Sequence, residues 1–176
     1  MEAETSLDQR PVIQASEILA KIERGEPVEY DGVTVEGELD LSKLELPTVN
    51  VDRTEGEKRL GLPEELKVIP SQITITNSEI HGKVNFRNAS FQELISFQEA
   101  KFTENATFFG AKFWENADFW GAKFSETANC RDAKSSAEMP TFREQSSAGM
   151  PTFRELSSAG MPISGKLSSA EMPTSG

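Results

Sequence analysis

Phenylalanine recurs through the middle of the chain with separations that alternate between five and six residues. The positions are Phe86, Phe91, Phe97, Phe102, Phe108, Phe113, Phe119 and Phe124. A small or apolar residue stands two residues before each of them: Val84, Ala89, Ile95, Ala100, Ala106, Ala111, Ala117 and Ala122. Residues two apart share a face of an extended segment, so both point inward and the residue between them, such as Lys101, points outward. The pattern predicts a coil of short extended sides with an eleven-residue period, clearest from Gln72 to Glu126.

The same spacing extends upstream, with aliphatic residues in the place of phenylalanine. Ile75 and Ile80 occupy the two preceding positions. Five-six-five spacing occurs again at Tyr30, Val35, Leu41 and Leu46. The phase is then lost until Ile69, across a charged stretch that contains Pro47, Gly56, Gly61 and Pro63. We therefore expect an excursion from the coil at about residues 47–68.

The unit F-x-x-A-x-F, as in Phe108-Phe109-Gly110-Ala111-Lys112-Phe113, resembles the variant of the pentapeptide-repeat family in which five- and six-residue steps alternate. The resemblance implies an all-β solenoid over residues 28–134, a right-handed quadrilateral β-helix with the excursion as an interruption. The Phe or Leu and the preceding small residue would stack in ladders along its axis. If four units complete one coil, residues 22 apart stack, which places Lys101 beside Lys123.

The N-terminal segment, residues 1–27, contains one short helical pattern. From Ala15 to Arg24 the apolar residues Ile18, Leu19 and Ile22 follow helical spacing. Ser16 is the expected N-cap and Gly25 the expected stop. A solenoid must cover its first coil, so we expect this helix to cap it. Its use as a partner-binding helix is the alternative.

The phenylalanine ladder ends before the C-terminal tail. Cys130 stands where the next Phe is due, and residues 135–176 form a Ser/Met/Pro-rich tail that we expect to be disordered. Met-Pro pairs keep the period of eleven, although proline lacks the amide that a ladder needs. We hypothesise that the tail is repeat DNA read out of frame. The last coil would then lack a cover, and end-to-end self-association is expected.

The net charge of −11 lies mostly at the N-terminal end. Residues 1–71 carry 8 Lys or Arg against 17 Asp or Glu, a net of −9. An acidic chain repels phosphate backbones, so we expect no direct nucleic-acid binding. The sequence has no apolar run of the length that a membrane span needs, and the acidic N-terminus lacks a signal pattern. A cytoplasmic protein without membrane contact is the expectation.

The sequence contains few residues that could act in catalysis or metal binding. The chain has one histidine, His81, and one cysteine, Cys130, so it cannot form a disulfide framework or a Cys/His metal cluster by itself. We expect no catalytic, cofactor-binding or metal-binding residues and no cofactor. Trp114 and Trp120 each follow a Phe position directly. They either form an exposed aromatic patch or pack into corners against Phe109 or neighbouring coils.

Three functions are compatible with these features to different degrees. The first is a non-catalytic repeat scaffold that presents β-helix faces to a protein partner. The second is implied by the family resemblance: a DNA-mimic regulator that inhibits or protects a type II topoisomerase such as gyrase. Most of the acid, however, precedes the phenylalanine-rich part of the coil. An enzyme would need a convergent catalytic group, and the sequence offers none.

Overall fold

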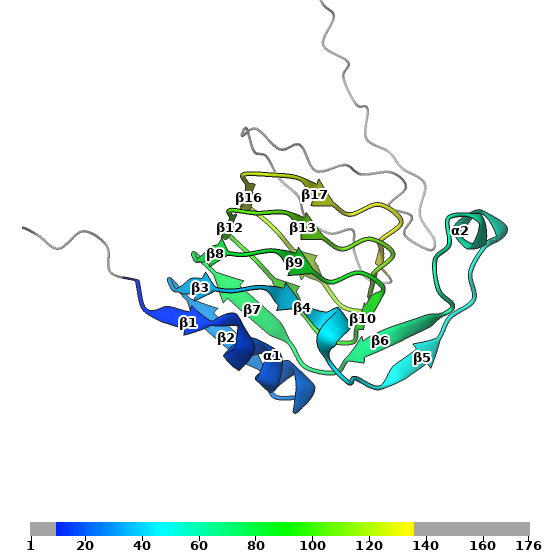
Figure 1. Cartoon of the computed structure of the whole chain (residues 1–176), viewed down its shortest axis with the longest axis horizontal. Coiled ribbons are helices and arrows are strands. Elements are labelled where there is room, and N and C mark those ends of the chain that lie inside the picture. The colour runs from blue at the N-terminus through cyan, green and yellow to red at the C-terminus, as the bar shows by residue number, and fades with distance from the viewer. Residues whose placement is uncertain (1–9, 136–176) are drawn as a thin grey trace, which may run out of the picture.

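The computed structural model describes residues 10–135, and these form a parallel β-helix with a helix at one end and an arm at its side (Figure 1). The chain passes from wall to wall in turn, so that each wall collects one strand from every coil. All strand pairs are parallel except one, β5 with β6. The prediction of an all-β, four-sided solenoid is confirmed.

The four walls are named in the order in which the first coil visits them. Wall 1 contains β2 (Val28–Asp31), β7 (Ile73–Thr76), β11 (Ile95–Ser96) and β15 (Ala117–Asp118). Wall 2 contains β1 (Val12–Gln14), β3 (Thr34–Glu36), β8 (Glu79–His81), β12 (Lys101–Phe102) and β16 (Lys123–Phe124). Wall 3 contains β4 (Leu39–Asp40), β9 (Val84–Asn85), β13 (Ala106–Thr107) and β17 (Ala128–Asn129). Wall 4 contains β5 (Thr48–Asn50), β6 (Glu65–Ile69), β10 (Ala89–Phe91), β14 (Lys112–Phe113) and β18 (Lys134–Ser135).

Residues 22 apart stack, as predicted from the spacing. Lys101 pairs with Lys123, and Phe102 pairs with Phe124. The Phe102 and Phe124 rings are stacked with centroids 4.7 Å apart, and the rings of Phe91 and Phe113 lie 5.2 Å apart. All eight ladder phenylalanines are at most 6% exposed. Each contributes about 1.5–3 kcal/mol through the apolar area it removes from water, so the ladder is a large source of stability.

The alternation of five- and six-residue steps has a backbone cause. Every eleventh residue has a left-handed conformation, with φ from 49° to 68°: Asn77, Asn88, Glu99, Gly110, Gly121 and Asp132. Each lies in a five-residue step. In the step from Phe108 to Phe113, for example, the Ala111 amide donates to the Phe108 carbonyl at 3.0 Å and closes a tight turn. Positive φ at the third turn residue is the type II geometry, which favours Gly and Asn. The six-residue steps from Phe91 onward contain no residue with positive φ, whereas the two earlier ones contain Gly37 with φ 101° and Gly82 with φ 140°.

The first coil is covered by α1 (Ala15–Glu23), as expected. Ile18 and Ile22 are fully buried in the core, and α1 packs against β2 and β4 (Figure 1). Gly25 follows the helix with φ 69°, as predicted for the stop. The predicted N-cap is wrong: Ser16 lies inside the helix, and Gln14 occupies the cap without a side-chain bond. The reason is that β1, paired with β3, continues directly into the helix.

The excursion is an ordered arm that interrupts wall 4. Val28 pairs with Ile73, 45 residues further on, whereas Ile73 pairs with Ile95 after 22. The additional residues form β5, α2 (Glu55–Arg59) and the start of β6. β5 and β6 pair in antiparallel register, with Thr48 opposite Lys67. We call residues 47–66 the arm, because β6 pairs in parallel with β10 from Lys67 onward.

At the C-terminal end, the coil continues as far as the structure describes it. Cys130 is buried at the position of a ladder Phe, and Ala128 pairs with Ala106. Ser135, which we had placed in the tail, is buried in β18 and pairs with Phe113. The predictions for residues 136–176, including disorder, an out-of-frame origin and end-to-end association, concern residues outside the described part. Within residues 10–135, no helix is long and apolar enough to cross a membrane.

Candidate interaction surfaces

The arm closes over wall 4 through a buried arginine. The Arg53 guanidinium, from which solvent is excluded, donates to the Gly110 carbonyl at 3.2 Å and to the Pro63 carbonyl at 3.0 Å. Its third partner is the Glu57 carboxylate at 3.0 Å. Leu62 of the arm is buried close to Gly110. These contacts hold α2 against the coil, so wall 4 already has an intramolecular partner.

Glu57 is the electrostatic centre of this contact. Its carboxylate accepts from the Thr54 amide in a capping box and lies 3.0 Å from both Arg53 and Lys134. Burial opposes ionisation, but the hydrogen bonds from Thr54, Lys134 and Arg53 outweigh it and lower the pKa of Glu57 to about 2. Wall 4 stacks Lys112 on Lys134. Burial, with Arg53 and Lys134 nearby, lowers the pKa of Lys112.

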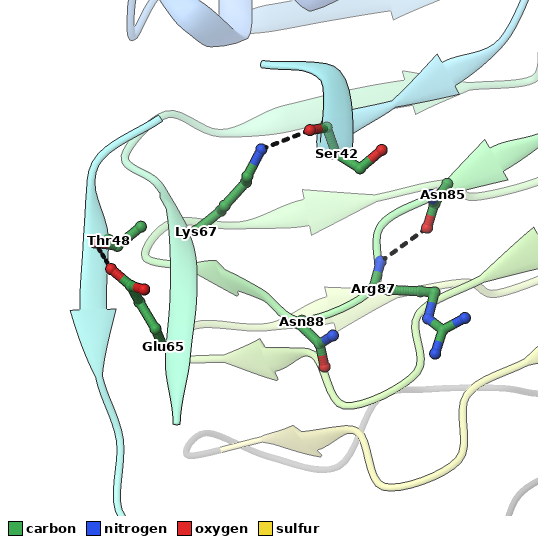
Figure 2. A pocket seen from close by; sticks show the side chains of 7 residues that line it. All are labelled: Ser42, Thr48, Glu65, Lys67, Asn85, Arg87 and Asn88. Atoms are coloured by element: carbon green, nitrogen blue, oxygen red, sulfur yellow. Dashed lines mark hydrogen bonds between the residues drawn. The ribbon is translucent and has the colours of Figure 1, made fainter. Parts of the chain in front are cut away.

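A polar pocket of about 350 Å³ lies where the arm leaves the coil. Figure 2 shows its lining: Ser42, Thr48, Glu65, Lys67, Asn85, Arg87 and Asn88. The Lys67 ammonium donates to the carbonyls of Leu41, Ser42 and Leu44 at 2.6–3.0 Å, which caps the 3₁₀ helix Leu41–Lys43. Because an ammonium has three donors, Lys67 is committed to this structural role. The remaining charged groups of the lining are Glu65 and Arg87.

Wall 2 presents charges of both signs that pair with each other. Its outward ladder runs Thr34, Glu79, Lys101, Lys123. Glu79 Oε2 lies 3.0 Å from His81 Nε2, and Glu79 Oε1 lies 3.5 Å from Lys101 Nζ. The hydrogen bond with His81 is the largest cause of the lowered pKa of Glu79, and the charge of Lys101 lowers it further. Partial burial of the carboxylate acts in the opposite direction but is outweighed. The single histidine of the chain thus belongs to an exposed surface network.

Wall 3 presents one acidic and three neutral polar side chains, which bond to their own turns or to each other. Its outward ladder runs Asp40, Asn85, Thr107, Asn129. Asn129 Oδ1 accepts from the Arg131 amide at 3.1 Å, and Asn85 Nδ2 donates to Asp40 at 2.9 Å. At the corner to wall 4, the Arg87 guanidinium lies 5.0 Å from the Phe109 ring centroid. The polar groups of this wall are largely used within the protein.

Wall 1 differs from the others in charge and in exposed aromatic surface. Its strands and the corners next to them span residues 28–32, 70–77, 92–99 and 114–121. These segments, which we call the wall 1 segments, hold six acidic residues and no Lys, Arg or His: Glu29, Asp31, Glu93, Glu99, Glu115 and Asp118. Sequence analysis missed this segregation, because the acids are scattered along the chain and meet only in the coil.

The two tryptophans lie at opposite corners of wall 1, on either side of β15. Trp114 is 46% exposed and Trp120 48% exposed, so both present large apolar surface to solvent. The Trp114 indole N–H donates to the buried Ser90 hydroxyl at 3.0 Å, which fixes the ring. Both alternatives from the sequence apply in part: the two side chains are exposed, and the Trp114 indole is held by Ser90 in β10 of the neighbouring coil. The Phe109 ring lies at a different corner, beside Arg87.

The described residues hold no candidate metal cluster, and their one cysteine is buried. Between residues 10 and 135, no three His, Cys, Asp or Glu side chains lie close enough to hold a metal ion. Burial raises the pKa of the Cys130 thiol to about 12, so it stays protonated and unreactive at neutral pH.

Comparison with known proteins gives one match. Residues 86–134 match the family model described as pentapeptide repeats, in nine copies. No curated protein and no solved structure matches the chain. The matched segment starts at the first ladder phenylalanine, whereas the same coil geometry begins at Val28. Upstream of Phe86, Ile and Val fill the inward positions that Phe and Ala fill later.

Proposed function

Because residues 86–134 belong to the pentapeptide-repeat family and their coil continues upstream to Val28, we propose that the chain is a non-catalytic scaffold that binds another protein on wall 1. The observation that carries this proposal is the exposure of Trp114 and Trp120 beside β15. Exposed tryptophans are enriched at the centres of protein interfaces, where they contribute much of the binding energy.

The other walls are less suited to bind a partner. The arm covers wall 4 through Arg53 and Leu62, and wall 2 pairs its own charges through Glu79. The outward side chains of wall 3 hydrogen-bond to the backbone of its turns or to each other. Wall 1 combines exposed apolar surface with polar rims, the composition of a protein-binding face. Leu94, 38% exposed at the same corner as Trp114, enlarges the apolar area.

The test is capture of a partner from a lysate of the source cells by wild-type chain and by the double variant Trp114→Ser/Trp120→Ser. The matched control is Val12→Ser/Leu60→Ser, which removes two residues of similar exposure, 54% and 53%, outside wall 1. We expect capture by the wild type and the control, and loss in the tryptophan variant. Melting temperatures of all three chains identify a loss that is due to unfolding. Equal capture by both variants would contradict the proposal.

A further inference from the structure

We propose that Lys112 and Lys134 of wall 4, together with Arg53 of the arm, form a binding site for a small oxyanion of the phosphate type. The site is on wall 4 and takes a small ion, so it is independent of the protein partner proposed for wall 1. The Lys112 ammonium makes no hydrogen bond or ion pair within residues 10–135.

Lys112 lies in the outward ladder of wall 4, the face that the arm covers. The ladder runs Val68, Ser90, Lys112, Lys134. Lys112 is half-buried, whereas Lys123, which also stands between an alanine and a phenylalanine, is exposed on wall 2. Burial without a hydrogen-bond partner is unfavourable for an ammonium group, and a bound anion would remove this penalty.

The charged groups around Lys112 leave an excess of positive charge. Burial is the largest cause of the lowered pKa of Lys112, and repulsion by Arg53 and Lys134 follows it. Glu57 and Asp52 attract the ammonium and act in the opposite direction. Glu57 lies 3.0 Å from both Arg53 and Lys134, so its carboxylate is already engaged by two cations. Three cations against two carboxylates leave one positive charge uncompensated.

The fold holds the three cations at one place. Lys112 and Lys134 are in-register neighbours in β14 and β18. Paired strands lie about 4.8 Å apart, so two outward side chains at one register can contact the same small ligand. The Arg53 guanidinium donates to the carbonyl of Gly110, two residues before Lys112, at 3.2 Å. An anion at the Lys112 ammonium therefore meets positive charge from the coil and from the arm.

A small phosphate-type ion suits this site better than an acidic segment of a protein. The arm occupies wall 4 through Arg53 and Leu62, so an extended chain cannot lie along the ladder without displacing it. Lysine binds phosphate as a point charge, whereas a planar carboxylate is the preferred bidentate partner of arginine. The Lys112 nitrogen is not among the sealed polar atoms that lack a partner, so a small solute can reach it.

Isothermal titration calorimetry of the full chain with inorganic phosphate tests the site. Ionic strength is held constant with NaCl, because exposed charges are screened. We expect saturable binding of phosphate and weaker binding of acetate, which carries less charge. No saturable heat with phosphate, or equal binding of acetate, would overturn the proposal.

Lys112→Gln and Lys123→Gln are a matched pair of variants, since each removes one outward lysine between an alanine and a phenylalanine. We expect the first to bind phosphate about tenfold more weakly and the second to bind like wild type. Lys112→Arg keeps the charge and should retain binding. Equal weakening in the two Gln variants, or a loss in Lys112→Arg as large as in Lys112→Gln, would overturn the assignment.

Thermal denaturation checks that the ion binds the folded chain. Phosphate at about ten times its dissociation constant should raise the melting temperature of wild type and Lys123→Gln by about 4 °C over NaCl of equal ionic strength. The same addition should leave Lys112→Gln unchanged. A rise of the same size in all three chains would indicate a general salt effect and contradict the site.

Inorganic phosphate and O-phosphoserine distinguish the two sources of the same chemical group. Binding of inorganic phosphate alone identifies the ligand as a free ion. Binding of O-phosphoserine with equal or higher affinity, and its loss in Lys112→Gln, identifies a phosphoryl group carried by a larger molecule. Binding of neither would overturn the proposal.

Discussion

Glu57 Oε1 lies 3.0 Å from Lys134 Nζ, and this ion pair joins the arm to β18, the last strand of the described coil. The arm leaves wall 4 in the first coil, so it connects the beginning of the solenoid to its far end. In a solenoid, each coil otherwise contacts only its neighbours, and stability is a sum of local terms. The arm adds a long-range contact to that arrangement, and its removal should affect the whole coil.

Glu57→Gln should destabilise the fold by about 3 kcal/mol. The substitution keeps the size of the side chain but leaves the Arg53 guanidinium buried without a carboxylate, and an uncompensated buried charge is costly. Urea denaturation followed by circular dichroism measures the effect. Glu64→Gln is the control within the arm, because its pair with Lys58 is exposed, and it should change stability by less than about 0.5 kcal/mol. Similar values for both variants would contradict a role of the arm as a clamp.

The stabilisation by Glu57 should depend on pH in one direction. Its pKa is about 2 in the folded chain, against 4.5 for the unperturbed group. A lowered folded-state pKa gives stability that is fully present above about pH 4.5 and lost as the pH falls toward 2. Its size is on the order of 3 kcal/mol. The difference in unfolding free energy between wild type and Glu57→Gln should therefore shrink between pH 6 and pH 2.5. A constant difference would argue against the assignment.

Gly110→Ala should cost more than Gly32→Ala, although the two residues have nearly the same φ, 66° and 65°. Both alanines carry the strain of a left-handed backbone, about 1 kcal/mol. At Gly110 a Cβ would also lie 2.5 Å from Asn88 Oδ1 and from Leu62 Cδ2, whereas at Gly32 it would have no neighbour within 4 Å. We expect an additional loss of about 1–2 kcal/mol at Gly110, measured by thermal denaturation. Equal losses at the two glycines would show that Leu62 and Asn88 can move away from a Cβ at residue 110 without cost.

Much of the coil could be predicted from the sequence because its side-chain pattern has a local cause. Alternation of inward and outward residues in a strand predicts that Ala89 and Phe91 are both buried, and the period of eleven gives the stacking of Lys101 on Lys123. The left-handed positions were also visible as Asn77, Asn88, Gly110 and Gly121, eleven residues apart, but Glu99 obscures the series. The Ser16 cap was wrong because pairing of β1 with β3 fixes where the helix starts.

The arm contacts and the acidic wall could not be predicted in the same way. The bond from Arg53 to the Gly110 carbonyl joins residues that are far apart in sequence, and no periodicity relates them. Asp118 and Glu93 belong to the same wall only because 22 residues complete one coil, which places β15 beside β11. The sequence also left the orientation of Trp114 open, since a corner residue can turn inward or outward. In the folded chain the indole N–H donates to the Ser90 hydroxyl of the neighbouring coil, a contact that no sequence pattern announces.

A gyrase supercoiling assay separates the scaffold from a topoisomerase regulator. The described part of wall 1 has four strands, which at about 4.8 Å spacing cover roughly 15 Å. One turn of duplex DNA covers about 34 Å and carries a charge every 1.7 Å or so. The wall is too short and too weakly charged to imitate a duplex, so we expect unchanged supercoiling and unchanged drug-induced cleavage. Inhibition or protection at stoichiometric amounts of protein would favour the regulator.

Hydrogen–deuterium exchange of the chain with and without its captured partner tests the central claim most directly. The account predicts slower exchange in residues 92–99 and 114–121, which contain the corners of Trp114 and Trp120, and unchanged exchange in residues 78–81 and 100–103 of wall 2. Protection of wall 2 or wall 3 with no change in the wall 1 segments would contradict it.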